Sequence, residues 1–265
     1  MTKTELLNKA ARNGEERLLL ARVLDKLELA RRRNIPSHTG FLSPGERACV
    51  EALLAAAGHP RHLFFGGYEG AQRNICVFLP DWQEPEDFQT GGDCPVCALR
   101  ASFPADGALT HRDFLGSLMG AGIKRETVGD IYVSAGQCDI LVTRQILPYL
   151  LEQWDSAGRT KLHLSVIPLA EVQRPAVEKR EIRDTVPSLR LDCLVGAAFS
   201  LARGPAGQLI AAGRVAVNDL VCLKGDRQLQ QGDRIAVRGL GKAALAQVGG
   251  TTRKGRLSVT LERWI

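Results

Sequence analysis

Apolar residues at three- and four-residue spacing predict helices in the first part of the chain. Leu19, Val23 and Leu27 lie on one face of such a helix, and Asn13-Gly14 separates it from a shorter helix that follows a capping-box pattern at Thr2–Glu5. Ser43-Pro44-Gly45-Glu46 supplies an N-cap, a first-position proline and a return acceptor, and Gly58 ends the helix that they begin. Residues 1–59 are therefore predicted to form a helical N-terminal domain.

After His59-Pro60 the pattern changes to short runs rich in β-branched and aromatic residues. Helices are predicted only from Thr110 to Met119 and from Leu147 to Trp154. The predicted strands are 62–65, 74–79, 130–134, 138–143 and 162–167. The last four strands and the two helices have the order β-α-β-β-α-β, so residues 60–172 are predicted to form a ferredoxin-like central domain. This order also underlies RNA-recognition modules (RRM-like), but the fold carries many unrelated functions.

The remaining residues are predicted to form a linker and a small C-terminal module, which makes the whole chain an α+β protein. Residues 173–186 are polar, rich in charges of both signs and bounded by prolines, as in a linker. In residues 187–265, two helices are predicted, one from Ser188 to Phe199 and one from Pro205 to Ala212. Strands follow at 214–218, 221–224 and 234–238, and the chain ends in a hairpin formed by 242–248 and 256–264.

Composition adds a strong asymmetry of charge. Residues 187–265 carry twelve Lys and Arg against five Asp and Glu, whereas residues 1–186 carry 23 against 24. A polyanion is the expected partner of so basic a module.

No membrane association is expected. The longest uncharged apolar runs have about ten residues, whereas a bilayer span needs about 20. The first residues lack the features of a secretory signal, so a cytoplasmic protein is expected, as a monomer. Seven cysteines, an odd number, suit reduced thiols.

The C-terminal module resembles the S4 RNA-binding domain. The resemblance departs from the usual pattern at Ala202 and Gly204, where serines on either side of an arginine are typical. It is carried by Arg190-Leu191-Asp192, Leu201-Ala202-Arg203, Ala206, Leu209-Ile210, Gly213–Asn218 and Gly232–Val237.

A longer resemblance covers essentially the whole chain. Residues 109–131 (Leu-Thr-His-Arg-Asp-Phe-Leu through Val-Gly-Asp-Ile) and 249–257 (Gly-Gly-Thr-Thr-Arg-Lys-Gly-Arg-Leu) are similar to the YlmH family of bacterial S4-domain proteins. The resemblance implies a non-enzymatic factor that binds the large ribosomal subunit and takes part in ribosome-associated quality control of stalled peptidyl-tRNA complexes.

The candidate RNA-binding residues are mostly cations of the C-terminal module. A-form RNA is recognised largely through phosphates and 2′-hydroxyls, and the planar guanidinium of arginine bonds two phosphate oxygens at once. Secondary contacts to RNA or the ribosome are predicted at His111, Arg112, Lys124 and Arg125. The predicted primary contacts are Arg190, Arg203, Gln208, Arg214, Asn218, Lys224, Arg238, Lys242, Arg253, Lys254 and Arg256.

Two alternatives remain open from the residues. Arg190-Leu191-Asp192 contains the Arg-Leu-Asp tripeptide of pseudouridine synthases, whose aspartate is a nucleophile, but its position inside the S4 pattern favours a structural role for Asp192 at the start of a helix. Cys94 and Cys97 could hold a metal or act in redox chemistry, yet a second Cys-x-x-Cys is absent. We therefore expect no metal, no cofactor and no catalytic residue, with Cys94 and Cys97 as free thiols in a loop.

Overall fold

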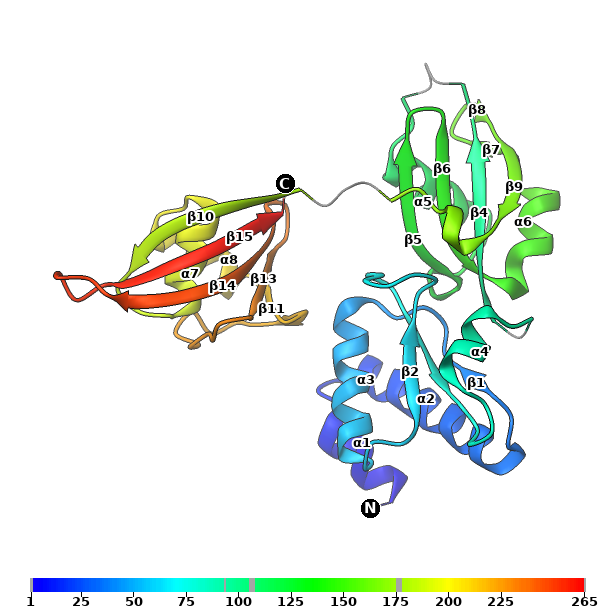
Figure 1. Cartoon of the computed structure of the whole chain (residues 1–265), viewed down its shortest axis with the longest axis horizontal. Helices are drawn as coiled ribbons and strands as arrows, with labels where there is room; N and C mark the ends of the chain where they lie inside the picture. The colour runs from blue at the N-terminus through cyan, green and yellow to red at the C-terminus, as the bar shows by residue number, and fades with distance from the viewer. Residues whose placement is uncertain (1, 93, 105–107, 175–177, 265) are drawn as a thin grey trace. The chain divides into compact units, whose positions relative to one another are not determined.

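The computed structural model divides the chain into two compact units, 1–175 and 176–265, which we call the N-terminal and C-terminal units (Figure 1). It describes residues 2–92, 94–104, 108–174 and 178–264. Helices and antiparallel sheets occur in both units, which confirms the α+β class. Among the described residues, no helix combines the length and the apolar character that crossing a membrane requires.

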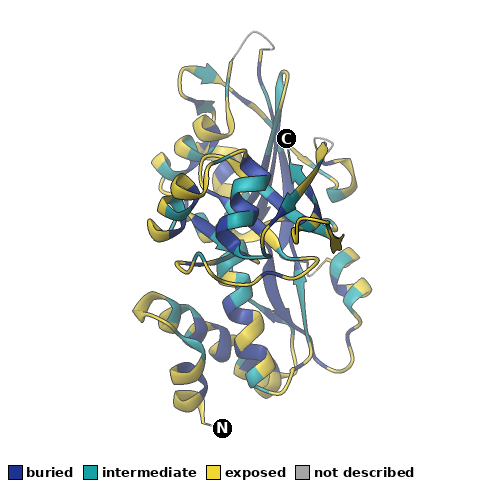
Figure 2. Ribbon diagram, turned by 90° about the vertical axis from the view of Figure 1, so that its left-hand side faces the viewer, coloured by how far each residue is buried: buried dark blue, intermediate teal, exposed yellow. Residues whose placement is uncertain are grey.

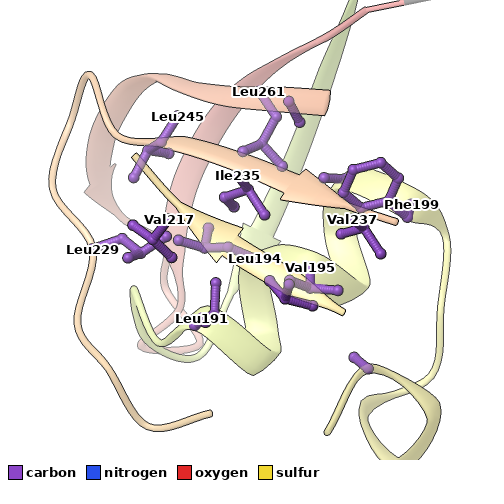
Figure 3. Packing of buried hydrophobic residues seen from close by; sticks show 14 of the residues in the cluster. Leu191, Leu194, Val195, Phe199, Val217, Leu229, Ile235, Val237, Leu245 and Leu261 are labelled. Carbon is purple, nitrogen blue, oxygen red and sulfur yellow. The ribbon is translucent and has the colours of Figure 1, made fainter. Parts of the chain in front are cut away.

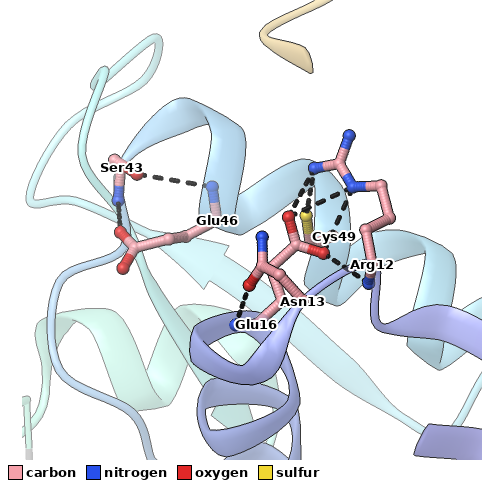
Figure 4. Close-up of polar contacts among 6 residues, drawn as sticks. All are labelled: Arg12, Asn13, Glu16, Ser43, Glu46 and Cys49. Atoms are coloured by element: carbon pink, nitrogen blue, oxygen red, sulfur yellow. Dashed lines mark hydrogen bonds and ion pairs between the residues drawn. The ribbon is translucent and has the colours of Figure 1, made fainter. Parts of the chain in front are cut away.

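The first part of the N-terminal unit combines helices with a small sheet. Its helices are α1 (Lys3–Ala10), α2 (Gly14–Arg33), α3 (Pro44–Ala56) and α4 (Pro85–Thr90), and its strands are β1 (Ser37–His38), β2 (His62–Phe65) and β3 (Ile75–Phe78). The predicted break and caps are confirmed. Asn13 accepts the Glu16 N–H (2.8 Å), and Ser43 and Glu46 form a reciprocal capping box at α3 (Figure 4). The Glu16 carboxylate also holds Arg12 (2.7 Å), whose guanidinium reaches Cys49 on α3.

One part of the predicted helical N-terminal domain is a strand. Ser37 and His38 pair with Phe78 and Val77, so β1 joins a three-stranded sheet in the order β1-β3-β2. A two-residue strand is too short to show an alternating pattern, and its partner lies far along the chain. The separation of 1–59 from 60–172 as domains stays a prediction.

The second part of the N-terminal unit is built on a four-stranded antiparallel sheet in the order β5-β6-β4-β9. The short elements β7 (Ser156–Ala157), β8 (Thr160–Lys161), η1 (Arg125–Thr127), η2 (Arg144–Ile146) and η3 (Leu169–Glu171) lie around it. The elements of the main order are β4 (Val96–Ser102), α5 (His111–Gly120), β5 (Val128–Ser134), β6 (Gln137–Thr143), α6 (Leu147–Gln153) and β9 (His163–Ile167).

The order β-α-β-β-α-β is present, but its first strand is β4 and not residues 74–79. The segment around β3 pairs instead with β1 and β2. Cys94 and Cys97 were predicted to lie in a loop, whereas Val96 begins the strand that pairs with both β6 and β9. A central strand of this kind is buried on both faces, so it lacks the alternation that identifies a half-exposed strand.

Both faces of β4 are covered. On one face, Leu99 and Ala101 pack with Phe114 of α5 and Leu150 of α6. On the other face, Val96 and Ala98 belong to a core that also contains Phe41, Phe65 and Val77 from the first part of the unit. The burial colouring in Figure 2 is mostly dark blue along the central strands β4 and β6. The two parts of the N-terminal unit therefore share a hydrophobic core.

The C-terminal unit packs two helices against a six-stranded antiparallel sheet in the order β10-β15-β14-β13-β11-β12. Leu194 and Val195 of the first helix pack with Ile235 and Leu245 of the sheet in a hydrophobic core (Figure 3). The elements are β10 (Lys179–Val186), α7 (Leu191–Phe199), α8 (Arg203–Ala211), β11 (Val215–Val217), β12 (Leu220–Val221), β13 (Arg234–Val237), β14 (Gly241–Thr251) and β15 (Leu257–Trp264).

The predicted linker is wrong for residues 179–186, which form β10. All eight residues of this strand pair with β15, from Lys179 opposite Trp264 to Val186 opposite Leu257. β10 lies at the edge of the sheet and is mostly exposed, so its composition is charged, as is typical of edge strands. Residues 175–177 of the predicted linker lie outside the described residues.

Candidate RNA interface

A buried carboxylate joins the first turns of α7 and α8. Arg190, the N-cap residue of α7, donates from Nε to Asp192 Oδ1 (3.1 Å) and from Nη2 to Oδ2 (3.0 Å). Arg203, the first residue of α8, donates from Nε to the same Oδ2 at 3.1 Å. The Asp192 side chain is only 8% exposed. Two of the predicted phosphate contacts thus lie side by side on one carboxylate.

The electrostatics of this cluster keep Asp192 ionised. Burial alone raises the pKa of a carboxyl group, but here hydrogen bonds from the side chains of Arg190 and Arg203 outweigh it, so the pKa of Asp192 is lowered. Two guanidinium charges against one carboxylate leave an excess of one positive charge. Asp192 lies in the first turn of α7, as predicted, and both of its oxygens already accept hydrogen bonds.

Both arginines keep guanidinium N–H groups that these hydrogen bonds do not use and that can donate to a ligand. The Arg203 side chain is 67% exposed, and its only hydrogen bond within the described residues uses Nε. Arg190 is 34% exposed and uses Nε and Nη2. A carboxylate that accepts from Nε fixes the orientation of the planar guanidinium group. The remaining N–H groups are then oriented to donate to phosphate oxygens.

A second basic group lies on strands β11, β13 and β14. Arg214, Arg238 and Lys242 line a shallow groove of about 490 Å³. Arg214 Nη2 donates to the Arg238 carbonyl (2.9 Å), and the Arg238 N–H donates to the Arg214 carbonyl (2.8 Å). The structure therefore brings these three predicted residues together.

Two predicted RNA contacts are instead engaged within the protein. Asn218 has a left-handed backbone (φ 50°), and its amide donates to Asp233 (2.7 Å) and accepts the Arg234 N–H (2.9 Å). Arg256 donates from Nε to Thr185 Oγ1 (3.0 Å) and from Nη2 to the Thr185 carbonyl, which ties β15 to β10. Both residues stabilise the unit itself.

The other primary candidates are spread over the surface of the C-terminal unit. Gln208 is exposed on α8, and Lys224 is exposed in the loop between β12 and β13. Arg253 and Lys254 are exposed at the tip of the hairpin between β14 and β15. An extended polyanion has to follow this surface to reach all four.

The predicted secondary contacts divide into exposed and structural residues. His111 and Arg112 are exposed in the first turn of α5, and Lys124 is exposed before η1. Arg125 is half-buried, and its Nη1 donates to the Val128 carbonyl. Burial lowers the pKa of Arg125, and the carbonyls around its guanidinium make it a structural residue of the turn.

The two cysteines of Cys-x-x-Cys are both buried, and Cys97 belongs to β4, which corrects the predicted loop. Burial raises the pKa of both thiols, so the nucleophilic thiolate form is disfavoured. In the described parts of the chain, no group of three or more His, Cys, Asp or Glu side chains is placed to hold a metal ion.

A group of cations that the sequence analysis did not single out lies near Lys124. Arg22 and Lys26 of α2 and Arg144 of η2 line the same cleft as Lys124. Nothing in the local sequence marks them, because the residues come from segments far apart in the chain. Only the packing of α2 beside the sheet brings them together.

Comparison with known proteins agrees with these features. A family model described as "Putative RNA-binding domain in YlmH" matches residues 101–171. Over 251 residues the chain is 30% identical to "Ribosome-associated protein quality control protein P2" of Bacillus subtilis (strain 168), an alignment covering 94% of this chain and 95% of that protein. The chain belongs to the YlmH family. The resemblance stated from sequence motifs is thereby confirmed.

A solved structure of the YlmH family supports the fold. The "Cell division protein ylmH from Streptococcus pneumoniae" aligns with a TM-score of 0.50 and 21% identity, covering 61% of this chain and 96% of that chain. The matched YlmH region, residues 101–171, begins at the end of β4 and ends at η3, so it covers α5, β5, β6, α6 and β9 of the four-stranded sheet and its helices.

Proposed function

We propose that this protein is a non-enzymatic RNA-binding factor that acts on ribosomal RNA of the large subunit, in the quality control of stalled peptidyl-tRNA complexes. The observation that carries the proposal is the pair of guanidinium groups, from Arg190 and Arg203, held on the buried carboxylate of Asp192. Such a pair presents excess positive charge on a rigid element, which suits a phosphate backbone.

Names of relatives support the same role. The Bacillus subtilis relative is named as a ribosome-associated quality control protein, and the matching family model is described as an RNA-binding domain. The basic excess of residues 187–265 supports placing the main RNA contact in the C-terminal unit.

The arrangement of elements supports two finer proposals. Residues 187–265 are proposed to form an S4 domain with a hairpin extension, preceded by the edge strand β10. The sheet order β5-β6-β4-β9 with two helices on one face matches the order expected of a ferredoxin-like, RRM-like unit.

Not every predicted residue contributes equally to this proposal. Asn218 and Arg256 support the interface through the turn and the strand that they hold. RNA contact is proposed for the remaining primary residues, Arg190, Arg203, Gln208, Arg214, Lys224, Arg238, Lys242, Arg253 and Lys254.

Asp192 is the reason for proposing a binding factor and not a pseudouridine synthase. A nucleophilic aspartate must reach its substrate, whereas Asp192 is buried and both oxygens accept bonds from Arg190, Arg203 or the Cys193 N–H. The carboxylate acts on RNA only indirectly, by orienting the two guanidinium groups.

Co-sedimentation with purified large ribosomal subunits tests the proposal. The double variant Arg190→Glu plus Arg203→Glu is expected to lose binding, and the milder Arg203→Gln to weaken it by roughly tenfold, about 1.4 kcal/mol. The control Arg180→Glu plus Arg183→Glu makes the same change of charge on exposed β10. Equal losses in both double variants, or no loss in Arg203→Gln, would contradict the proposed interface.

A further inference from the structure

The N-terminal unit contains a cleft of about 820 Å³. Its walls come from α2, the segment after β1, the turn between α5 and β5, and the end of β6. This volume is in the range of sites that enclose a small molecule or a nucleotide. The cleft lies wholly within one compact unit, so its shape follows from the packing described above.

Four cations from three separate segments line this cleft, namely Arg22, Lys26, Lys124 and Arg144. Two carboxylates also reach it, but both have partners. Glu46 accepts the Ser43 N–H at 2.6 Å, and Glu126 lies 3.9 Å from Arg22. Within the described ranges, neither the Lys26 nor the Lys124 ammonium group has an ion-pair or hydrogen-bond partner. The cleft therefore attracts an anion.

A buried hydroxyl beside the cleft lacks a hydrogen-bond partner within the part of the chain that the structure describes. Thr143 lines the cleft and is only 6% exposed, yet its Oγ1 has no hydrogen-bond partner among the described residues. A buried polar atom without a partner costs about 1–3 kcal/mol, so such atoms are uncommon unless a ligand completes them. A phosphate oxygen accepts the hydrogen bond that this hydroxyl is able to donate.

A histidine adjoins the same cations. His38 lines the cleft, and its Nδ1 donates to the Thr39 carbonyl (2.8 Å), since a carbonyl only accepts. Burial, and to a lesser degree Lys26, lowers the pKa of His38. A phosphate bound beside it would favour the protonated ring and raise that pKa again, which provides a local signal of occupancy.

The rest of the lining mixes apolar and polar residues. Leu19 of α2 contributes a partly exposed apolar side chain, beside Thr39, Thr127 and Gln145. A ligand with an anionic group and a flat, weakly polar part fits such a lining better than inorganic phosphate does. A ribonucleotide has both.

We propose that this cleft is a second RNA site, which holds a nucleotide of single-stranded RNA with its phosphate against Lys26, Lys124 and the Thr143 hydroxyl. The base and ribose lie against the apolar part of the lining, at Leu19. This inference rests on the proposed function only in taking RNA as the partner. A free mononucleotide shares the chemistry, and the experiment separates the two sources.

Fluorescence anisotropy with a labelled single-stranded hexaribonucleotide tests the proposal on the full chain. The measurements are made in the Arg190→Glu plus Arg203→Glu background, so that the C-terminal contact is already weakened. Lys26→Glu plus Lys124→Glu is expected to lower the affinity about tenfold or more. The control Lys9→Glu plus Arg159→Glu makes the same charge change at exposed positions of the same unit. This control is expected to change the affinity for the hexaribonucleotide less than about twofold. Equal effects of the two pairs overturn the proposal.

Thr143→Val separates binding from packing. Valine keeps the shape and removes the unpartnered hydroxyl, so the free energy of unfolding of the unbound protein is expected to stay the same or rise, while affinity for the hexaribonucleotide falls roughly threefold to tenfold. A loss of stability with unchanged affinity overturns the proposed role of Thr143.

Competition identifies the source of the ligand. Adenosine monophosphate is expected to displace the hexaribonucleotide only weakly, because it lacks the phosphates of the neighbouring nucleotides. Displacement at the same concentration as unlabelled RNA would make this a mononucleotide site and overturn the RNA assignment. Loss of subunit co-sedimentation in the Arg190 and Arg203 variant is independent of these results, so the proposed function and this inference fail separately.

Discussion

Arg203 Nε lies 3.1 Å from Oδ2 of Asp192, a residue eleven positions earlier in the chain and in the preceding helix. Arg190 donates to both oxygens of the same carboxylate. The Arg-Leu-Asp sequence at the start of α7 therefore orients an arginine of α8 in addition to its own. This relationship links the stability of the C-terminal unit to the charge that it presents.

Asp192→Asn tests that link through pH. The pKa of Asp192 is lowered in the folded protein, so its stabilisation is present above the unfolded value of about 3.8 and is lost as the pH falls through the folded value. At pH 7 the free energy of unfolding of the wild type is expected to be higher than that of the variant, by on the order of 1 kcal/mol. Urea titrations are expected to show a constant difference from pH 7 to pH 5 that shrinks below pH 4. A difference that grows with acid would refute the ion-pair assignment.

RNA affinity should fall steeply with salt. If about five phosphates are neutralised, the log–log slope of the association constant against salt concentration is on the order of −4. Lys254→Gln, at the exposed hairpin tip, is expected to make the slope shallower by about 1 without changing the melting temperature. The matched change Lys9→Gln lies in the other unit and should leave the slope as it is. An unchanged slope in Lys254→Gln removes the hairpin tip from the footprint.

Asp139→Ala should destabilise the N-terminal unit strongly. Asp139 is 1% exposed, accepts two bonds from Arg100 (2.7 and 2.8 Å) and accepts the Gln173 N–H (2.7 Å). Removing the carboxylate leaves a largely buried guanidinium without its counter-charge, at a cost of about 3–5 kcal/mol in free energy of unfolding. Asp155→Ala, which breaks an exposed pair with Lys161, is the control and should leave chemical denaturation unchanged. Similar losses in both variants would show that burial does not govern the effect.

Replacing each of two glycines by alanine should change the free energy of unfolding in opposite directions. A Cβ atom at Gly129 in β5 would lie 2.7 Å from a ring carbon of Phe41 and 2.9 Å from Leu141 Cβ, so Gly129→Ala is expected to destabilise by about 1–3 kcal/mol. Gly116 lies within α5 with no atom within 4 Å of an added Cβ, and Gly116→Ala should stabilise by about 0.5–1 kcal/mol. Thermal unfolding distinguishes them, and a rise in melting temperature for Gly129→Ala would contradict the close packing of Phe41.

The sequence correctly predicted features that are specified by residues within a few positions of one another. The capping box at Thr2–Glu5, the break at Asn13-Gly14 and the N-cap at Ser43 depend on one or two side chains and adjacent backbone, and all were found where expected. Element boundaries moved slightly: α7 begins at Leu191 and not at Ser188. Helix caps and turns depend on neighbouring residues, so they can be predicted from the sequence.

Strands whose identity depends on distant partners were misassigned. β4 is a central strand buried on both faces, β10 is a charged edge strand, and β1 has only two residues. None shows the alternation of a half-buried strand, and each is defined by hydrogen bonds to segments far along the chain.

The sequence by itself determined the family, the helical caps and the concentration of basic residues in 187–265, because these depend on residue identity and short-range order. The tertiary structure alone decided which charges are available. It placed Arg190 and Arg203 on Asp192, engaged Asn218 and Arg256 internally, and gathered Lys26 with Lys124 in one cleft. The availability of a charged group depends on which atoms surround it, and those atoms come from chain segments that only folding brings together.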